Sequence, residues 1–294
     1  MDPGIRALNS FVSVIEEGNF GRAAARLYMT APALSQQIRR LEQQLGVRLV
    51  DRDTQPLVPT EAGELLLEHA HRILQATQDA AVDLARLSRR RDRVLRLGFI
   101  NGGPNRLSTR LLQLIASPLE LSQLEWDEQV SAVASGAVDA ALVRPPLPLL
   151  DGLTFERVAE EPRVVMVRRG HRFSGRDSVS IDEIDDEAHV STDRAPAEWI
   201  SYWAVDPRPS GRPVRWGQLV RTMDEQVQAV AAGLGVAITA ASLADYHSGA
   251  EVDFIPIHDI APCTIELCTR TGDDHPGVLE IRRAVAQLRG SAGS

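Results

Sequence analysis

Residues 11–63 read FVSVIEEGNFGRAAARLYMTAPALSQQIRRLEQQLGVRLVDRDTQPLVPTEAG, and this stretch decides the fold of the first part of the chain. Apolar residues at helical spacing predict a first helix that ends before Gly18 and a second, short helix over 20–27. A tight turn precedes a third helix, which is predicted to begin after Thr30 and to stop at Gly46. This succession is typical of a helix-turn-helix.

The third helix has one apolar and one polar face. The apolar stripe, at spacings of four and three residues, consists of Leu34, Ile38, Leu41 and Leu45. The opposite face consists of Pro32, Gln36, Arg39, Arg40 and Gln43. Glutamine pairs with adenine and arginine with guanine or phosphate, so this face suits the major groove of DNA; a solvated helix on a small bundle is the alternative. Residues 47–50 and 56–59 predict the two short strands of a wing.

Charge is distributed unevenly along the chain. The net charge of the 294 residues is −8, but residues 1–93 carry +1 and residues 94–294 carry −9. The segment 20–52 carries +4, all of its basic residues being arginine, because the chain has no lysine. An acidic protein does not bind nucleic acid generally, whereas a compact basic patch near one end can. The arginines that we expect to contact DNA are Arg22, Arg26, Arg39, Arg40 and Arg52.

A long helix without proline is predicted to follow the wing, from Thr60 to about Arg91. At 1.5 Å per residue it would be about 46 Å long. Apolar and small residues repeat along it at alternating spacings of four and three, as in a coiled coil. The members of this seam are Leu66, Ala70, Ile73, Thr77, Ala80, Leu84 and Leu87. We expect the seam to join two subunits; packing against the chain's own domains is the alternative.

Residues 94–294 alternate predicted strands and helices, which favours an α/β fold with parallel sheets. Strands are predicted at 94–100, 121–126, 138–144, 163–167 and 263–269, and the run 233–239 follows the helix predicted at 224–232. Helices are predicted at 107–115, 128–135, 224–232 and 276–288.

The stretch 11–63 resembles the winged helix-turn-helix of LysR-type transcriptional regulators. The resemblance is carried by F..V...G.F..AA..L, PALS.QI..LE..LG..L..R and TEAG, in one block without a gap. It implies that the DNA-reading helix presents Pro32, Ser35, Gln36 and Arg39. Two positions depart from the family pattern: Ala31 replaces a usual glutamine, and the wing carries Asp51 and Asp53 where many members are basic.

Residues 94–294 resemble the effector-binding domain of the same family, which has the two-lobed fold of type-2 periplasmic binding proteins. Three stretches carry this resemblance: GAVDAALVR (136–144), VVMVRRGHRFSGRDSVSIDEI (164–184) and AVAAGLGVAIT (229–239). The region 111–126 departs from the family pattern by being several residues shorter, which implies a truncated first helix or second strand of this domain. Lobe 1 is then about 94–161 and 264–294, and lobe 2 about 162–263, with chain crossings near 160–163 and 260–264.

Ligands of such folds bind between the lobes, at the carboxyl ends of strands and at helix N-termini. The candidate effector-binding residues are Asn101, Gly102, Asn105, Arg144, Ser191, Thr192, Asp193 and Thr222. Glycine amides together with Arg144 suit a carboxylate, so we expect a small organic acid. Trp199, Tyr202 and Trp203 are interpreted as a local hydrophobic patch; facing the cleft, they would cap an aromatic ring instead. Cys263 and Cys268 are expected to be buried and unpaired, with redox sensing as the alternative.

The sequence thus predicts a winged helix-turn-helix DNA-binding domain (1–59), a linker and dimerisation helix (60–93) and a two-lobed α/β effector domain (94–294). The expected function is a transcriptional regulator that binds promoter DNA and a small-molecule effector as a homodimer or homotetramer. As an activator it would also contact RNA polymerase.

A solute-binding protein and an α/β enzyme are the alternatives. The winged helix and the lack of a signal peptide oppose the first, and the lack of HExxH, P-loop and G-x-S-x-G motifs opposes the second. We expect no catalytic residue, metal, cofactor or membrane segment, and a cytoplasmic location.

Overall fold

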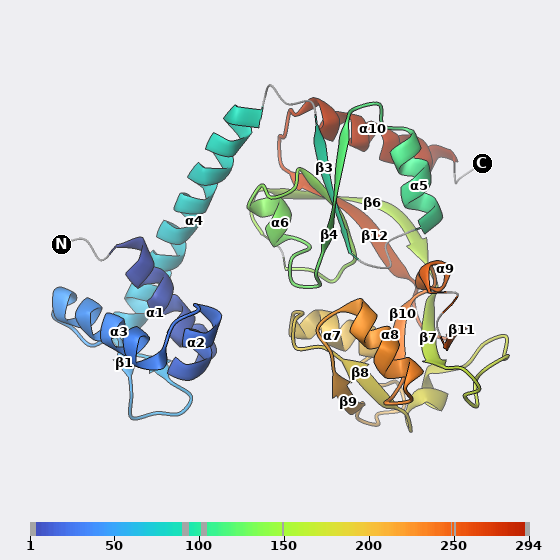
Figure 1. Cartoon of the computed structure of the whole chain (residues 1–294), viewed down its shortest axis with the longest axis horizontal. Coiled ribbons are helices and arrows are strands. Elements are labelled where there is room, and N and C mark those ends of the chain that lie inside the picture. Colours follow the sequence, from blue (N-terminus) through green and yellow to red (C-terminus); the bar gives the residue numbers. More distant parts are fainter. Residues whose placement is uncertain are drawn as a thin grey trace. The chain divides into compact units, whose positions relative to one another are not determined.

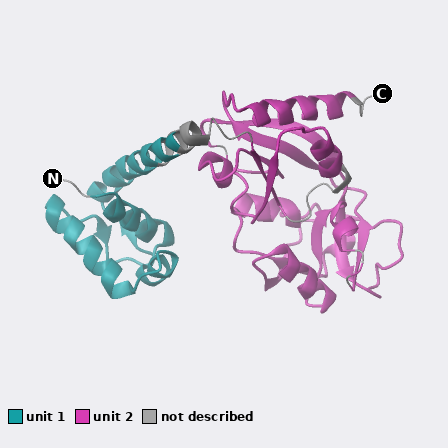
Figure 2. Ribbon diagram, turned by 45° about the horizontal axis from the view of Figure 1, so that its top comes forward, with its two compact units in different colours: residues 1–84 teal, residues 85–294 magenta. Residues whose placement is uncertain are grey.

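A computed structural model describes residues 4–89, 94–100, 105–148, 150–247, 249 and 251–291. The chain divides into two compact units, residues 1–84 and residues 85–294 (Figure 2). Each unit is described by itself.

The first unit contains the predicted helix-turn-helix. Its helices are α1 (Ile5–Glu17), α2 (Phe20–Arg26) and α3 (Ala31–Leu45). Gly18 ends α1 and Gly46 ends α3, both with the positive φ that glycine adopts most readily. A side chain at Gly18 would also meet Pro56 at 2.8 Å. Asn19 caps α2 by accepting hydrogen bonds from two amides of its first turn.

The wing is shorter than predicted. It consists of β1 (Val50–Asp51) and β2 (Val58–Pro59), which pair antiparallel. Proline has no amide hydrogen to donate to a strand partner, so Pro59 limits the ladder. The core below the wing joins Phe11 and Val14 of α1 to the buried leucine stripe of α3. The prediction that one face of α3 is apolar and packs in the core is therefore confirmed.

α4 (Glu61–Arg89) is the predicted long helix. Its first turns belong to the core of the first unit: Ala70 is fully buried against Leu8 and Val12, and Leu66 packs there too. The predicted seam is thus divided, because Ala70 is unavailable to a second subunit. Further along, Ile73 and Leu84 are 43% and 68% exposed. Thr77 and Ala80 are also exposed, and the side chain of Leu87 lies outside the description.

Lobe 1 of the second unit contains a five-stranded mixed sheet in the order β4-β3-β5-β12-β6 (Figure 1). The strands are β3 (Leu95–Ile100), β4 (Leu119–Leu124), β5 (Ala140–Val143), β6 (Leu153–Glu161) and β12 (Cys263–Arg270). The helices are α5 (Asn105–Gln113), α6 (Ser131–Ala134) and α10 (Pro276–Ser291). α5 and α10 pack on one face through a core that includes Leu111 and Ile281, and Val133 of α6 belongs to a separate cluster with Cys268.

Lobe 2 contains a three-stranded antiparallel sheet, β10-β7-β11, and a separate parallel pair, β8 and β9. Its strands are β7 (Arg163–Arg168), β8 (Ala188–Ser191), β9 (Arg215–Leu219), β10 (Ala237–Ala240) and β11 (Val252–Pro256). Its helices are the short 3-10 helix η1 (Ile181–Ile184), α7 (Ala197–Ala204), α8 (Met223–Ala231) and α9 (Leu243–Tyr246). The α/β class is confirmed, but the prediction of parallel sheets was only partly right. In lobe 1, β3 pairs parallel with β4 and β5, but β12 lies between β5 and β6 and runs antiparallel to both.

Two connections join the lobes, one between β6 and β7 and one between β11 and β12. Arg163 lies at this junction. Its guanidinium donates to the carbonyl oxygens of Ala261 (2.9 Å) and Tyr202 (2.8 Å) and lies 4.5 Å from the centre of the Tyr202 ring. Burial lowers the pKa of Arg163, yet these contacts solvate the cation where water cannot.

Candidate functional site

The outer face of α3 presents the polar side chains expected from the sequence. Pro32, Gln36, Arg39 and Arg40 are exposed, whereas Ser35 is half-buried. Arg22 and Arg26 lie on α2. Arg26 pairs with Glu16 at 2.8 Å, and Arg22 hydrogen-bonds to the carbonyl oxygen of Glu17. These pairs are exposed and therefore hold their arginines only weakly.

Glu42 connects α3 to the wing, and sequence reasoning missed it. One carboxylate oxygen accepts hydrogen bonds from the amides of Leu49 (3.0 Å) and Val50 (3.3 Å). The other binds the guanidinium of Arg52 at 2.8 Å. Arg52, the wing residue expected to contact DNA, is therefore engaged by α3 and also lies 5.7 Å from the centre of the Phe20 ring. Its contact with DNA stays a prediction.

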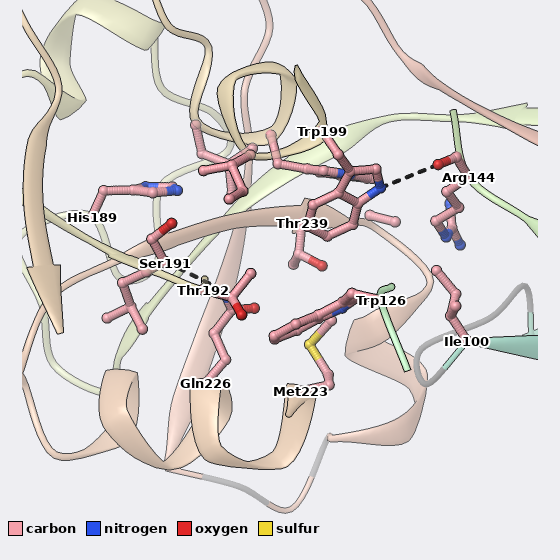
Figure 3. Close-up of a pocket in the computed structure, with 15 residues that line it drawn as sticks. Ile100, Trp126, Arg144, His189, Ser191, Thr192, Trp199, Met223, Gln226 and Thr239 are labelled. Carbon is pink, nitrogen blue, oxygen red and sulfur yellow. Dashed lines mark hydrogen bonds between the residues drawn. The ribbon is translucent and has the colours of Figure 1, made fainter. Parts of the chain in front are cut away.

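A pocket lies between the two lobes of the second unit (Figure 3). Lobe 1 contributes Ile100 at the end of β3, Trp126 after β4 and Arg144 after β5. Lobe 2 contributes side chains from β8, α7, α8 and β10. The empty space between the lining residues is about 530 Å³, a volume that includes the open solvent at the mouth of the pocket.

One wall of the pocket is aromatic. Trp199 and Trp203 lie one turn apart on α7, with ring centres 5.6 Å apart, and Trp126 approaches Trp199 from lobe 1 at 5.9 Å. All three are buried. Gln129 fixes this arrangement, because it donates to the carbonyl oxygen of Trp126 and accepts from the amide of Arg144. The interpretation of Trp199 and Trp203 as only a local patch was incomplete, since both line the pocket.

Arg144 lines the pocket, but its charge is balanced by Glu161, which is not among the lining residues. Its guanidinium forms an ion pair with Glu161 and donates to Ser242 Oγ (3.2 Å) and Cys263 Sγ (3.4 Å). Glu161 also accepts from the amide of Ser242 at 2.8 Å. This cluster lies at the junction of the lobes, because Glu161 ends β6 and Cys263 begins β12.

The remaining polar groups of the pocket come from lobe 2. Ser191 and Thr192 present hydroxyls, and the Gln226 amide donates to the carbonyl oxygen of Val190 at 3.3 Å. Burial, and to a lesser extent the charge of Arg208, lower the pKa of His189 to about 3, so its imidazole is neutral. Among the described residues, neither His189 Nδ1 nor Trp203 Nε1 has a hydrogen-bond partner. The described lining includes no aspartate or glutamate.

The predicted ligand residues are only partly brought together. Arg144, Ser191 and Thr192 line the pocket. Asp193 is exposed and Thr222 caps α8 through the Glu225 amide, and neither is among the lining residues. Asn101 and Gly102 lie outside the described residues, as does the side chain of Asn105. Trp126, His189, Gln226 and Thr239 were missed, since no local pattern marks residues that meet only between lobes.

Both cysteines are buried and unpaired, as expected. Burial raises the pKa of Cys263 to about 11 and that of Cys268 to about 12, so both remain protonated thiols. No cluster of three or more histidine, cysteine, aspartate or glutamate side chains suited to a metal ion occurs in the described part of the chain. No described helix is long and apolar enough to cross a membrane.

Known proteins match both units. Residues 5–64 match the family described as bacterial regulatory helix-turn-helix protein, lysR family, and residues 88–289 match the LysR substrate binding domain. The Escherichia coli (strain K12) Hca operon transcriptional activator HcaR is 30% identical over 269 residues, which cover 88% of each chain. From the same organism, the uncharacterized HTH-type transcriptional regulator YnfL is 34% identical over 199 residues, 66% of this chain and 67% of YnfL.

Among solved structures, full-length CbnR complexed with its target DNA superposes with a TM-score of 0.56. The two chains are 22% identical, and the match covers 97% of this chain and 99% of CbnR. At this identity the likeness concerns the fold.

Proposed function

Because the chain belongs to the LysR family of DNA-binding transcriptional regulators, with an effector-binding domain behind its helix-turn-helix, we propose that a small organic acid controls its binding to promoter DNA. The acid binds in the pocket between the lobes. The observation that carries this proposal is the composition of the pocket: hydroxyl and indole donors face it, and its described lining includes no carboxylate. Hydrogen-bond donors without a competing carboxylate suit an anion.

The acid is held by hydrogen-bond donors of lobe 2. Arg144, which the sequence predicts to bind the carboxylate, has a different role. Its pairing with Glu161 leaves no net charge for a ligand, so Ser191 and Thr192 are the better candidates. Arg144 instead ties the pocket to the junction of the lobes. Beside the pocket, Arg194 of lobe 2 pairs with Asp127 of lobe 1 at 3.4 Å. A ligand that changes the angle between the lobes acts on this junction.

DNA recognition is assigned to residues 1–59, with Gln36 and Arg39 reading bases and the remaining arginines binding phosphate. Residues 60–93 join two subunits through the exposed part of the seam, from Ile73 to Leu84. A homodimer places two copies of α3 on one DNA duplex, and two such dimers form a homotetramer. Contact with RNA polymerase follows only for an activator.

The test combines two measurements on the full chain. Gel-shift assays use DNA from upstream of its own gene, and a thermal-shift screen compares small carboxylic acids with the corresponding amides. An effector at about 100 times its Kd stabilises the folded chain by about 2.7 kcal/mol. We expect acids, and not amides, to raise the unfolding temperature and to change the gel shift. Absence of DNA binding, or equal stabilisation by amides, would refute the proposal.

A further inference from the structure

We infer that the ligand carries a planar aromatic ring, which lies against Trp126, Trp199 and Trp203. These three side chains are called the tryptophan wall below. The inference rests on the proposed function, because it specifies the class of acid that the same pocket accepts.

The tryptophan wall belongs to a buried apolar cluster and at the same time lines the pocket. Trp199 and Trp203 are four residues apart on α7 and therefore share one face of that helix, toward the pocket. Trp126 comes from the other lobe, and its backbone carbonyl oxygen accepts a hydrogen bond from the Gln129 side chain. The rings are tilted by 39° and 52° to one another, so they meet without stacking face to face. Indole faces bind flat rings by offset stacking or edge contacts.

The pocket has an aromatic end and a polar end. In Figure 3, Trp126 and Trp199 lie between Arg144 on one side and His189 with Ser191 on the other. A ligand with a ring at one end and an acid group at the other matches this division. None of the described lining residues is an acid that would compete with the ligand's acid group for the donors.

Trp203 adds an independent observation. Trp203 is a lining residue, and its indole N–H is buried and has no acceptor among the described residues, whereas Trp199 Nε1 donates to the Arg144 carbonyl oxygen at 3.2 Å. An indole N–H can only donate, and buried donors in folded proteins are nearly always paired. The missing partner is therefore an acceptor on the ligand, close enough to the ring to be reached from the tryptophan wall.

The ring also explains how the ligand affects both lobes. Trp126 belongs to lobe 1, and Trp199 and Trp203 belong to lobe 2. A flat ring in contact with all three bridges the lobes without an ion pair. The Trp199 hydrogen bond to Arg144 then connects the bound ring to Glu161 and Ser242 at the junction.

The experiment is a calorimetric titration of the full chain with four probes: benzoate, 2-naphthoate, cyclohexanecarboxylate and benzamide. We expect the aromatic acids to bind, and cyclohexanecarboxylate, which keeps the acid but lacks the flat ring, to bind at least fivefold more weakly. Trp216→Phe provides an optical check. It removes the one tryptophan outside the pocket, which is 48% exposed, so quenching then reports on the tryptophan wall alone.

Two variants locate the ring and its acceptor. Trp126→Leu keeps an apolar side chain, and we expect it to weaken the aromatic acids about tenfold and cyclohexanecarboxylate less than threefold. Trp203→Phe removes the N–H but keeps a ring, and we expect it to weaken both kinds of acid. Trp216→Phe is the control outside the pocket lining. Its ring meets the His189 ring edge-on at 5.9 Å, and phenylalanine keeps an aromatic ring there, so we expect every affinity to stay unchanged.

The outcomes separate this inference from the proposed function. If benzoate and cyclohexanecarboxylate bind equally well, the inference of an aromatic ring is refuted, but the proposal of an organic acid is not. If benzoate and benzamide bind equally well, the inference of an aromatic ring is supported, and the proposal of an organic acid is refuted. If neither benzoate nor 2-naphthoate binds, the inference is refuted. This result is obtained with the wild-type chain and does not depend on the folding of a variant.

Discussion

Replacing Glu42 with alanine should loosen the joint between the DNA-reading helix and the wing. The Glu42 carboxylate accepts from the amides of Leu49 and Val50, at 3.0 and 3.3 Å. Both residues are about 1% exposed. A hydrogen bond to a charged group contributes roughly 1.5–3 kcal/mol, and an amide left without an acceptor adds a desolvation cost. Water reaches part of this site, because the Glu42 side chain is 12% exposed.

We therefore expect Glu42→Ala to lower the free energy of local opening by about 2 kcal/mol, which is about a 30-fold loss of amide protection. The assay is hydrogen exchange of the full chain, resolved at Leu49 and Val50, with the amide of Ile38 in α3 as the internal reference. Tryptophan fluorescence cannot serve here, since residues 1–84 contain no tryptophan.

Glu42→Gln is the matched control. It keeps a carbonyl oxygen for the two amides and loses only the ion pair with Arg52. That pair is partly exposed and contributes about 0.5 kcal/mol, so protection should fall about twofold. Unchanged protection in Glu42→Ala, or an equal loss in both variants, would show that the wing is held by its apolar contacts and not by Glu42.

Three further predictions concern the other surfaces. Gln36→Ala should weaken specific DNA binding by roughly 1–3 kcal/mol and leave non-specific binding unchanged, because Gln36 is exposed opposite the buried stripe; an unaltered sequence preference in competition gel shifts would remove Gln36 from the reading surface. Ala80→Glu should dissociate the dimer, since it places a charge in the middle of the exposed seam, whereas Gln75→Glu, on the outer side of the heptad, should not; sedimentation at micromolar concentration decides between them. His189 has a pKa of about 3 in the folded chain and an ordinary pKa near 6.5 when unfolded, so the unfolded chain takes up more protons as the pH falls. Stability should therefore decrease by about 1.4 kcal/mol between pH 7.5 and 5.5, and urea unfolding followed by tryptophan fluorescence should show this loss in the wild type but not in His189→Gln.

The first unit could be predicted almost completely because its signals are local. The leucine stripe of α3 and the terminating glycines, Gly18 and Gly46, act within one or two turns of chain. What escaped prediction there was Glu42, whose partners follow it by seven to ten residues. A glutamate on a helix surface is normally solvated, so its type and position carry no signal.

The pocket was harder to predict because it forms between segments far apart in sequence. Trp126 and Trp199 come from different lobes, and Arg144 meets Glu161 only where the chain crosses between them. An arginine at the end of a strand, such as Arg144, predicts a ligand-binding residue. Only the folded structure shows that its charge is paired with the Glu161 carboxylate. β6 was missed because its pattern, half-exposed and rich in charge, lacks the continuous apolar run of a buried strand.

The burial of Ala70 against Leu8 and Val12 has a consequence for protein engineering. DNA-binding heads of related regulators are natural modules to exchange, and the end of the wing, at Thr60, looks like the place to join them. A junction at Thr60 would separate the first turns of α4 from Leu8 and Val12 of α1, which cover Ala70, and would leave a cavity in the core of the transferred DNA-binding domain. A functional chimera must carry the helix at least past Leu74, which packs in the same cluster, and must join the partners within the solvent-exposed turns that follow.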